Sequence, residues 1–425
     1  MEEFSLADQT IAALSSPRKG LVNYSMNRIT EFLEIDREKK MLPSAQQSIS
    51  TEYHSLRDST RFIIDDDFLE FATLHSISVD ADALCAGIEI ARPPIPQMWI
   101  EWNEAKRQEI LQEKLASDST DRQVARSDGP YGRLTSFGES FGTERCGYVV
   151  QELAEKNRMA DETGEGTLPT GFHWVFTPVF AMPRTKNQPE QVAPIVFSPL
   201  SFILSEEGWT GPDEVHRLGA GVDAFAHRER EKEAVEYIVG DWWINKHKSA
   251  NAAIEQLHRH LHIGQSRSIG WWVPIERGFN NEPFAKLSNL AIHFMQGDFR
   301  FLISVISTLN FDWRVQKQSV RFTGRRIRYG KHAPFNSHIE LSIELPKKNG
   351  IVLRAGVLGD GIGTRRLHEV RGHWRCYRSG NRAWVRAHKR GSKELGEVTK
   401  DYRLKTGTHT STSVGKEIRN GREAL

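Results

Sequence analysis

The feature that most constrains the fold of this chain is a long apolar segment at residues 283–310. Large apolar side chains recur from Phe284 to Leu309 at the spacing of a helix, and they form a stripe too broad for a helix with one face in water. We therefore expect a helix that is covered on most of its circumference and lies at the centre of the fold. A break in this helix is expected at Gly297-Asp298.

Short apolar runs before this helix provide strands that could cover it. They are separated by proline, glycine and polar turns, and they lie at residues 98–102, 147–150, 172–182 and 194–204. This pattern favours a mixed or mostly antiparallel sheet over repeated βαβ units. The predicted class is α+β, with the sheet packed on the long apolar helix and a basic β-hairpin module near the C-terminus.

Strand alternation makes a finer prediction for the first of these runs. It places Trp99 and Glu101 on one face of the strand, and Ile100 and Trp102 on the other. We expect one of these two faces to lie in the core.

Composition fits a globular protein without membrane spans. The chain has 425 residues, 38% hydrophobic and 26% charged, and no apolar run approaches the roughly 18 residues that a membrane span needs. Its acidic start, Met1-Glu2-Glu3, lacks the apolar core of an export signal. Cys85, Cys146 and Cys376 are far apart, which argues against a disulfide scaffold or a CxxC zinc site. A reducing cytoplasm is the expected location, with no membrane partner.

The net charge of +2 hides a strong asymmetry between the two ends of the chain. Residues 314–425 hold 26 Lys and Arg against 9 Asp and Glu, a formal charge of +17, whereas residues 1–313 carry −15. A region this basic is typical of a protein that binds a polyanion, and the acidic remainder would confine that ligand to one end. The alternative is that the two regions attract each other and serve only packing and solubility.

These patterns predict four segments. They are an N-terminal helical segment (1–60), an acidic α+β body with polar excursions (61–313), a basic β-rich module (314–404) and a loose tail (405–425). Within the body, residues 103–145 are expected to form a long surface excursion, and residues 213–262 to form polar helices.

Three motifs that suggest a metal or a nucleotide have simpler interpretations. Asp65-Asp66-Asp67 is interpreted as a helix N-terminus ahead of Phe68, because acids are favoured there and consecutive carboxylates point in different directions. His258 and His262 would share a face of one helix, but neither an HExxH glutamate nor a third ligand accompanies them. Gly359–Gly363 lacks the order of a P-loop. No metal and no cofactor is predicted.

Cations and aromatics alternate in two runs near the C-terminus, at residues 368–377 and 382–391. The Ser-Gly-Asn sequence between the runs supplies turn residues, which predicts a β-hairpin. Strand alternation would then put Trp384, Arg386 and His388 on one exposed face.

Such a surface suits RNA or another single-stranded nucleic acid, because bases stack on indole and guanidinium planes while cations hold the phosphates. The alternative is an edge hairpin with solvated cations and core tryptophans. The predicted nucleic-acid contacts are Arg371, His373, Trp374, Arg375, Tyr377, Arg378, Trp384, Arg386 and Arg390.

A second function class is a metal-independent ribonuclease. Cleavage through the 2′-hydroxyl needs a general base, a general acid and a cation that stabilises the phosphorane. The candidates for these roles are His368, His373, His388 and Tyr402, with Arg371 as the cation. On one uninterrupted strand His368 and His373 would face opposite sides, so a bulge at Gly372 is required to bring them together. The alternative for the histidines is that they form hydrogen bonds that brace the hairpin.

A family resemblance rests on three short elements of the chain. They are Met98-Trp99-Ile100-Glu101-Trp102, the helix end Ile306-Ser307-Thr308-Leu309-Asn310, and His368-x-Val370-Arg371-Gly372-His373-Trp374-Arg375 followed by Trp384-Val385-Arg386. In these elements the chain resembles a group of phage and prophage proteins of largely unknown function. Through its Arg-Gly-His-Trp element it also resembles the anti-CRISPR proteins that lower production of the type V CRISPR nuclease by causing loss of its messenger RNA.

The resemblance implies a mobile-element protein that acts in a bacterial cytoplasm on RNA or on a translating ribonucleoprotein complex, and so regulates host or competitor gene expression. It does not imply that this chain inhibits a CRISPR system. A virion or scaffold protein that uses its polar excursions as interaction loops is a further alternative.

Overall fold

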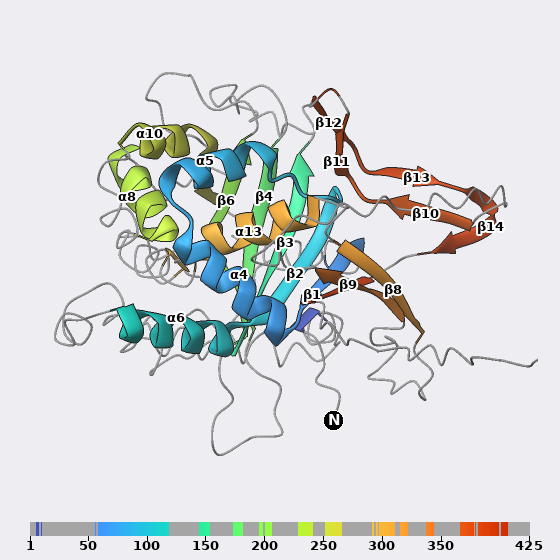
Figure 1. Ribbon diagram of the computed structural model, residues 1–425, viewed down its shortest axis with the longest axis horizontal. Helices are drawn as coiled ribbons and strands as arrows, with labels where there is room; N and C mark the ends of the chain where they lie inside the picture. The colour runs from blue at the N-terminus through green and yellow to red at the C-terminus, as the bar shows by residue number, and fades with distance from the viewer. Residues whose placement is uncertain are drawn as a thin grey trace, which may run out of the picture.

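The computed structural model describes one large mixed sheet, the helices that cover it and two smaller C-terminal sheets (Figure 1). Among the residues that it describes, no helix has the length and apolar character that a membrane crossing requires. The Gly359–Gly363 loop and most of the N-terminal segment lie outside these residues. The described residues are 6, 7, 10, 56, 58–118, 144–153, 173–181, 195–198, 200–205, 228–240, 251–265, 291, 292, 295, 297–310, 315–321, 337–343, 366–377, 379, 381–398 and 401–406.

In the described part of the chain, ten strands form the central sheet, in the order β7-β6-β4-β3-β2-β1-β15-β9-β8, with β5 paired to β4. Their bounds are Thr60–Ile64 (β1), Gln97–Asn103 (β2), Arg145–Leu153 (β3), His173–Ala181 (β4), Ile195–Phe197 (β5), Leu200–Ser205 (β6), Leu261–Gln265 (β7), Val315–Arg321 (β8), Ser337–Ile343 (β9) and Asp401–Thr406 (β15). Neighbours from β2 to β7 pair antiparallel, whereas β1 pairs in parallel with β2 and β15, and β15 with β9. The predicted α+β class with a mixed sheet is confirmed.

Three helices stack on one face of this sheet, with the apolar helix innermost (Figure 1). They are α13 (Asp298–Asn310), α4 (Asp66–Ser78) and α5 (Ala81–Ile90). Eleven of the 13 residues of α13 are buried, and its Phe301 ring lies 4.8 Å from the ring of Trp102 in β2. Gly297, with a φ of 75°, adopts a left-handed conformation just before α13 begins. The prediction of a central apolar helix is confirmed for residues 298–310, with the predicted break at this glycine, and residues 283–290 lie outside the described part of the chain.

Strand β2 is buried on both faces, whereas the sequence predicted one. Trp99 and Glu101, on the face opposite α13, are both fully buried. The backbone N–H groups of Leu6 and Ala7 each donate to the Glu101 carboxylate at 3.0 Å, which places these two residues over this face. The Trp99 indole lies so close to Gly147 of β3 that a Cβ there would come within 2.2 Å of the ring.

The acidic triplet begins a helix, as predicted. Asp65 is the N-cap of α4, and its carboxylate accepts a hydrogen bond from Phe68 N at 3.1 Å, with Asp66 and Asp67 in the first turn. Asp80 caps α5 in the same way. The carboxylates therefore satisfy the helix N-terminal N–H groups that lack partners within the helix.

Helix α6 (Glu104–Asp118) corrects the prediction of a surface excursion over residues 103–145. Its sequence is polar, but Glu104, Arg107, Ile110 and Leu111 are buried and fasten it to the body. The charged residues of α6 have good helix propensity, but few apolar residues mark its buried stripe, so the sequence pattern alone suggests a loop. Residues 119–143 lie outside the described part of the chain.

The helices predicted between residues 213 and 262 are confirmed in the described residues of that segment, as α8 (Arg228–Val239) and α10 (Asn251–His260). Helix α10 ends at His260, and His262 lies in strand β7, so His258 and His262 do not share a helical face. Instead, His258 Nε2 lies 3.1 Å from Glu236 Oε1 of α8.

Five short strands form two smaller sheets that project from the body at the right of Figure 1, and we call them the C-terminal arm. They are β10 (Arg366–Val370), β11 (His373–Cys376), β12 (Arg382–Val385), β13 (His388–Arg390) and β14 (Ser392–Val398). Strands β11 and β12 pair antiparallel, and Tyr377 N donates to Asn381 O at 2.8 Å across the turn. The predicted hairpin is confirmed. Strand β10 pairs antiparallel with β13 and parallel with β14.

The central sheet crosses the boundary that charge predicted at residue 314. Strands β8, β9 and β15 follow that boundary in sequence, yet they lie in the same sheet as β1. The arm is therefore inserted between two strands of the body, β9 and β15. Lys405 and Thr406, predicted to begin a loose tail, are the last residues of β15, and residues 407–425 lie outside the described part of the chain.

Candidate nucleic-acid interface

The turn between β10 and β11 fastens the arm to the body. Arg371 Nη1 donates a hydrogen bond to Leu309 O at 3.1 Å, and Trp374 Nε1 donates to Ile90 O at 2.8 Å. Leu309 and Ile90 lie in the last turns of α13 and α5, where carbonyl groups lack helical partners and a cation suits the helix dipole. Two residues of the Arg-Gly-His-Trp element therefore act as anchors.

Gly372 of the same element contacts both the body and the arm. Its N–H donates to Pro94 O at 2.6 Å, and a Cβ on it would lie 2.7 Å from Cζ2 of Trp384. The chain changes sheet here, because β10 ends at Val370 and β11 begins at His373. The bulge that the ribonuclease hypothesis requires at Gly372 is not formed. The chain instead leaves the three-stranded sheet here and enters the two-stranded one, so His368 and His373 lie in different sheets.

Two of the predicted site residues lie in the core. Arg371 and Tyr402 are each 6% exposed, and the guanidinium carbon of Arg371 lies 6.0 Å from the centre of the Tyr402 ring. Tyr402 also stacks on Phe62 of β1 at 4.7 Å between ring centres. Because the body encloses both side chains, neither the Arg371 guanidinium nor the Tyr402 hydroxyl is accessible to a nucleic-acid strand. We leave both out of the interface.

Trp374 and Trp384 face each other across the hairpin and pack edge to face, with ring centres 5.4 Å apart and planes at 60°. The guanidinium carbon of Arg92 lies 5.1 Å from the centre of the Trp374 ring. Both tryptophans are half-buried. Trp374 is thus hydrogen-bonded to the body, whereas Trp384 packs against Trp374 and Gly372 within the arm.

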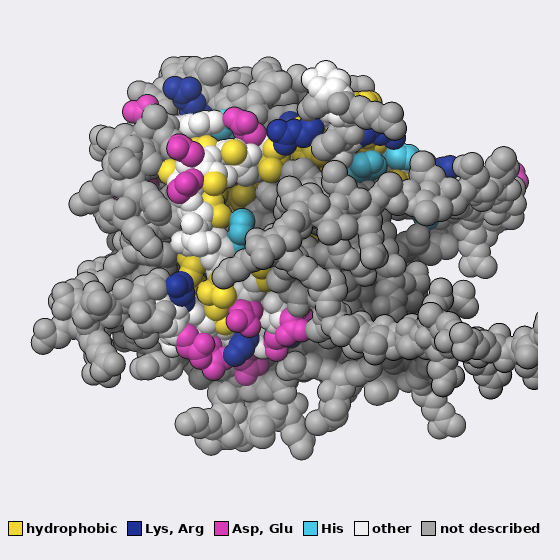
Figure 2. Space-filling model, viewed as in Figure 1, with side chains coloured by type: hydrophobic (Ala, Val, Ile, Leu, Met, Phe, Trp, Pro, Cys, Tyr) yellow, Lys and Arg dark blue, Asp and Glu magenta, His cyan; other side chains and the backbone are white. Residues whose placement is uncertain are grey.

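Seven basic residues among the described residues of the arm are exposed. Figure 2 shows Lys, Arg and His side chains along the edge that leads to the arm, whereas most acidic side chains in view gather over the body. Tyr377, at the turn of the hairpin, is 49% exposed and is the one large apolar side chain that is exposed among the described residues. The exposed basic residues of the arm are Arg375, Arg382, Arg386, His388, Lys389, Arg390 and Lys393.

The candidate histidines separate into two places. His368 pairs with Arg390 and Val370 with His388 in the three-stranded sheet, so His368, His388 and Arg390 share one face. His373 lies in the other small sheet, with Nδ1 3.2 Å from Arg371 O. His388 Nδ1 lies 3.1 Å from Arg386 O. Both of these contacts are local ones of the kind that brace a turn.

The predicted common face of Trp384, Arg386 and His388 is not formed. Strand β12 ends at Val385 and β13 begins at His388, so Trp384 and His388 belong to different sheets. The prediction assumed one continuous strand through residues 384–388, but the chain leaves strand β12 at Arg386. Arg378, also predicted as a contact, lies outside the described residues.

A polar pocket of about 170 Å³ lies where the hairpin meets the body. The body supplies Arg92, Glu152 and Trp174, and the end of the hairpin supplies Trp384 and Arg386. Trp174 is 5% exposed, and its indole N–H is buried without an acceptor among the described residues. The pocket thus brings two predicted contacts, Trp384 and Arg386, together with three body residues that the sequence did not single out.

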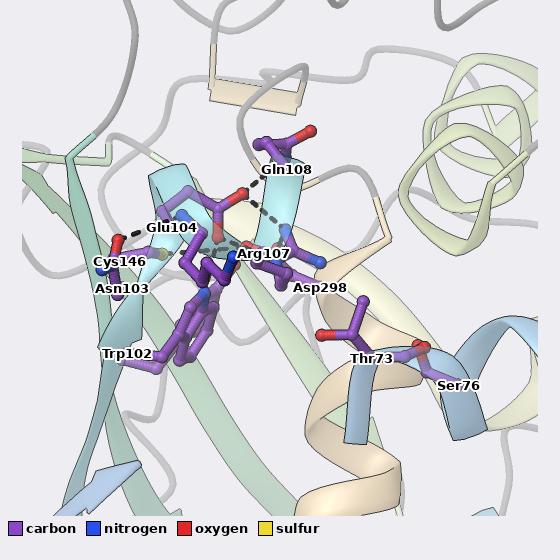
Figure 3. Close-up of polar contacts among 11 residues, drawn as sticks. Thr73, Ser76, Trp102, Asn103, Glu104, Arg107, Gln108, Cys146 and Asp298 are labelled. Atoms are coloured by element: carbon purple, nitrogen blue, oxygen red, sulfur yellow. Dashed lines mark hydrogen bonds and ion pairs between the residues drawn. The ribbon is translucent and has the colours of Figure 1, made fainter. Parts of the chain in front are cut away.

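A buried polar cluster that was also not predicted joins α6, α13, β2 and β3 (Figure 3). Arg107 Nε and Nη2 donate to the two oxygens of Glu104 at 2.7 and 2.9 Å, and Nη2 also donates to Asp298. Tyr148 Oη donates to Asp298 Oδ2, and Trp102 Nε1 to Glu104 Oε2, both at 2.5 Å. All five side chains belong to residues at most 5% exposed.

In this cluster the Arg107 guanidinium pairs with two carboxylates, Glu104 and Asp298, which leaves a surplus negative charge in the core. Burial raises the pKa of Asp298 to about 7, although Arg107 opposes the shift. Burial also raises the pKa of the Tyr148 hydroxyl and of the Cys146 thiol, both of which are hydrogen-bonded to Asp298. The cluster is enclosed on all sides, so it links elements of the body and offers no surface to a ligand. Its one sequence signal was the i, i+3 spacing of Glu104 and Arg107.

Comparisons with protein-family models, with curated proteins and with solved structures found no match to this chain. The resemblance carried by the Arg-Gly-His-Trp element therefore stays a prediction. The functional argument depends on the geometry of the arm and of the pocket at its base.

Proposed function

We propose that this protein binds RNA or another single-stranded nucleic acid through its C-terminal arm. The observation that carries the proposal is the charge of the arm's exposed surface. Against one exposed acid, Glu394, the described residues of the arm expose the cations Arg375, Arg382, Arg386, Lys389, Arg390 and Lys393. A solvated surface that serves only solubility mixes both signs, so this excess favours an anionic ligand.

The arm divides its residues between anchoring and contact. Arg371 and Trp374 hold it to the helix ends, whereas Arg375, Arg382, Arg390 and Lys393 lie on its exposed surface, where they contact phosphates. Tyr377 and the half-buried Trp384 offer rings on which bases stack, a contact that tolerates any base and suits single strands. The formal charge of −15 on residues 1–313 repels the same ligand and favours binding at the arm.

Salt dependence of RNA binding tests the proposal. Anisotropy of a fluorescent oligouridylate, titrated with the full chain, should report binding that weakens steeply between about 50 and 200 mM salt, with a log–log slope of roughly −0.7 per phosphate contact. A duplex of the same length should compete less well than the single strand, because its bases are not available for stacking. Absence of binding, or an affinity that does not change with salt, contradicts the proposal.

The resemblance to phage and anti-CRISPR proteins supports a narrower form of the proposal, in which the RNA is a messenger RNA or part of a translating complex in a bacterial cytoplasm. Crosslinking of the chain to RNA in living bacteria, followed by sequencing of the attached RNA, tests this form. Messenger or ribosomal RNA should be enriched over a variant in which Arg375, Arg382 and Arg390 are replaced by glutamine. Equal recovery with the variant contradicts it.

One observation favours a second candidate, a metal-independent ribonuclease. His368 and His388 are diagonal neighbours on one face of the three-stranded sheet, a relation that typically puts Cα atoms roughly 7–8 Å apart, and Arg390 lies beside them. An acid, a base and a cation are the groups that 2′-hydroxyl attack requires. Incubation of labelled RNA with the chain and a chelator should then give cleavage that His388→Ala abolishes. Intact RNA in the same reaction excludes this candidate and leaves binding as the function.

A further inference from the structure

We propose that the pocket between the hairpin and the body binds a phosphate group, which on a bound strand is one backbone phosphate. This inference rests on the function proposed above and identifies one fixed contact within it. The pocket lies at the base of the arm, with Trp174 and Arg92 on the body side and Arg386 on the arm side. A strand that follows the exposed cations of the arm toward the body would reach it.

The indole N–H of Trp174 is the donor assigned to this phosphate. Trp174 lines the pocket at 5% exposure, and its N–H is buried without an acceptor among the described residues. A buried donor left without an acceptor is costly, so native proteins keep few of them unless a ligand or water accepts. Other indoles in the body and at the hairpin follow the rule, since Trp99 donates to Glu101, Trp102 to Glu104 and Trp374 to Ile90 O.

The charges of the pocket select an anion. Arg92 and Arg386 place two guanidinium groups around it, and Glu152 places one carboxylate, so its formal charge is positive. A phosphate only accepts hydrogen bonds, and the flat guanidinium group presents paired donors that match its oxygens. A cation would be repelled by both arginines, and a neutral apolar group would gain nothing from their charge.

The size of the pocket limits what it can hold. Its volume of about 170 Å³ is below the roughly 300–1,000 Å³ of pockets that enclose drug-sized molecules. A phosphate with part of its sugar fits this volume better than a whole nucleotide does. The base and the neighbouring nucleotides would then lie outside, on the arm, where the Trp384 ring forms the rim.

The anchoring turn makes the pocket a preformed one. Its walls come from parts of the chain far apart in sequence, and the bonds from Gly372 to Pro94 O and from Trp374 to Ile90 O hold them together. A ligand therefore does not have to order the two walls when it binds, which reduces the entropic cost of binding.

Trp174→Phe tests the assigned donor, because it keeps an aromatic ring and removes the N–H group. Affinity for a fluorescent oligouridylate should fall roughly tenfold, as expected for a lost hydrogen bond to a charged group. The salt slope should stay that of the wild type, because no charge is removed. Leu204→Ala is the matched control: Leu204 is the register partner of Trp174, is 1% exposed and does not line the pocket. Equal losses of affinity in the two variants, at a temperature where both are folded, overturn the proposal.

Glu152→Gln provides a test with the opposite sign. Removal of the one carboxylate in the pocket should raise affinity for the oligouridylate roughly two- to fivefold, the range expected for a single partly screened charge. Glu394→Gln, on the exposed strand β14, removes an equal charge outside the pocket and should have a smaller effect. A larger effect of Glu394→Gln, or a loss of affinity with Glu152→Gln, overturns the proposal.

The ¹⁵N–¹H resonance of the Trp174 indole, identified by its absence in Trp174→Phe, separates this inference from the function on which it rests. Inorganic phosphate, uridine 5′-monophosphate and oligouridylate should all shift it, whereas uridine should not. If oligouridylate binds and the resonance does not move, the pocket assignment is wrong and the proposed function stands. If the two small phosphates shift the resonance and oligouridylate does not bind, the pocket is a phosphate site and the proposed function is wrong.

Discussion

The body and the arm use the same residue types for opposite purposes. In the body, Arg107 and Trp102 are buried and donate to a carboxylate that the chain itself supplies, Glu104. In the arm, Arg375 and Arg390 are exposed on a surface with few carboxylates. The sequence alone does not separate these cases, because arginine and tryptophan are frequent in both. Burial and the supply of internal acceptors distinguish a cation that stabilises the fold from one that is available to a ligand.

Loss of the buried guanidinium should have the largest effect on stability. Arg107→Ala removes the cation that pairs with two buried carboxylates, Glu104 and Asp298, and breaking such a buried ion pair costs about 3–5 kcal/mol. Chemical denaturation should show this loss, while RNA affinity measured below the unfolding transition should stay that of the wild type. Lys106→Ala, which removes an exposed ion pair to Glu109 on the same helix, is the control and should leave the midpoint unchanged. A loss of RNA affinity in Arg107→Ala would remove the contrast between body and arm.

Arg371 and Arg375 lie four residues apart in one motif, and the contrast predicts opposite behaviour for them. Arg371→Ala removes a buried charged donor from Leu309 O and should destabilise the protein by about 1.5–3 kcal/mol. Arg375→Ala should leave stability nearly unchanged and weaken RNA binding, because its side chain is exposed on β11. Thermal unfolding and anisotropy on both variants check this. The contrast fails if Arg375→Ala is the more destabilising of the two.

The buried carboxylate of Asp298 predicts that the stability of the fold depends on pH. Asp298 has a pKa of about 7 in the folded chain, against about 3.9 for an unfolded aspartate, so the folded state binds this proton more tightly. Its contribution is therefore complete below about pH 4 and is lost as the pH rises through about 7. The loss has a slope of up to about 1.4 kcal/mol per pH unit.

Asp298→Asn cannot titrate, so the difference in unfolding free energy between wild type and variant should change across this window. Urea denaturation at a series of pH values measures that difference. A constant difference from pH 4 to pH 8 would show that Asp298 stays charged beside Arg107.

Local patterns in the sequence predicted the parts of the fold that depend on neighbouring residues. The apolar stripe of α13, the Asp65 cap and the hairpin turn each involve residues within a few positions of one another. The buried cluster was not predicted, because Arg107 and Asp298 are 191 residues apart. The second buried face of β2 was missed for the same reason, since Leu6 and Glu101 are 95 residues apart.

Composition singled out the arm as the candidate interface, but it did not predict which of its side chains are exposed. Arg375, Tyr377, Arg386 and Arg390 are exposed, whereas Arg371 is buried. Alternation along a strand assigns side chains to two faces, but it does not say which part of the arm docks on the body. That choice depends on the carbonyl groups at the ends of α5 and α13, which only the folded chain brings beside the arm.

The salt slope of RNA binding in a triple variant of the arm tests the central claim most directly. Arg375, Arg382 and Arg390 are replaced together by glutamine, and the control carries the same replacement at Lys106, Lys114 and Arg259 on the helices of the body. At roughly 0.7 per phosphate contact, the arm variant should lose about two units of log–log slope and the control none. Equal slopes in the two variants, or a greater loss in the control, would contradict the assignment of nucleic-acid contact to the arm.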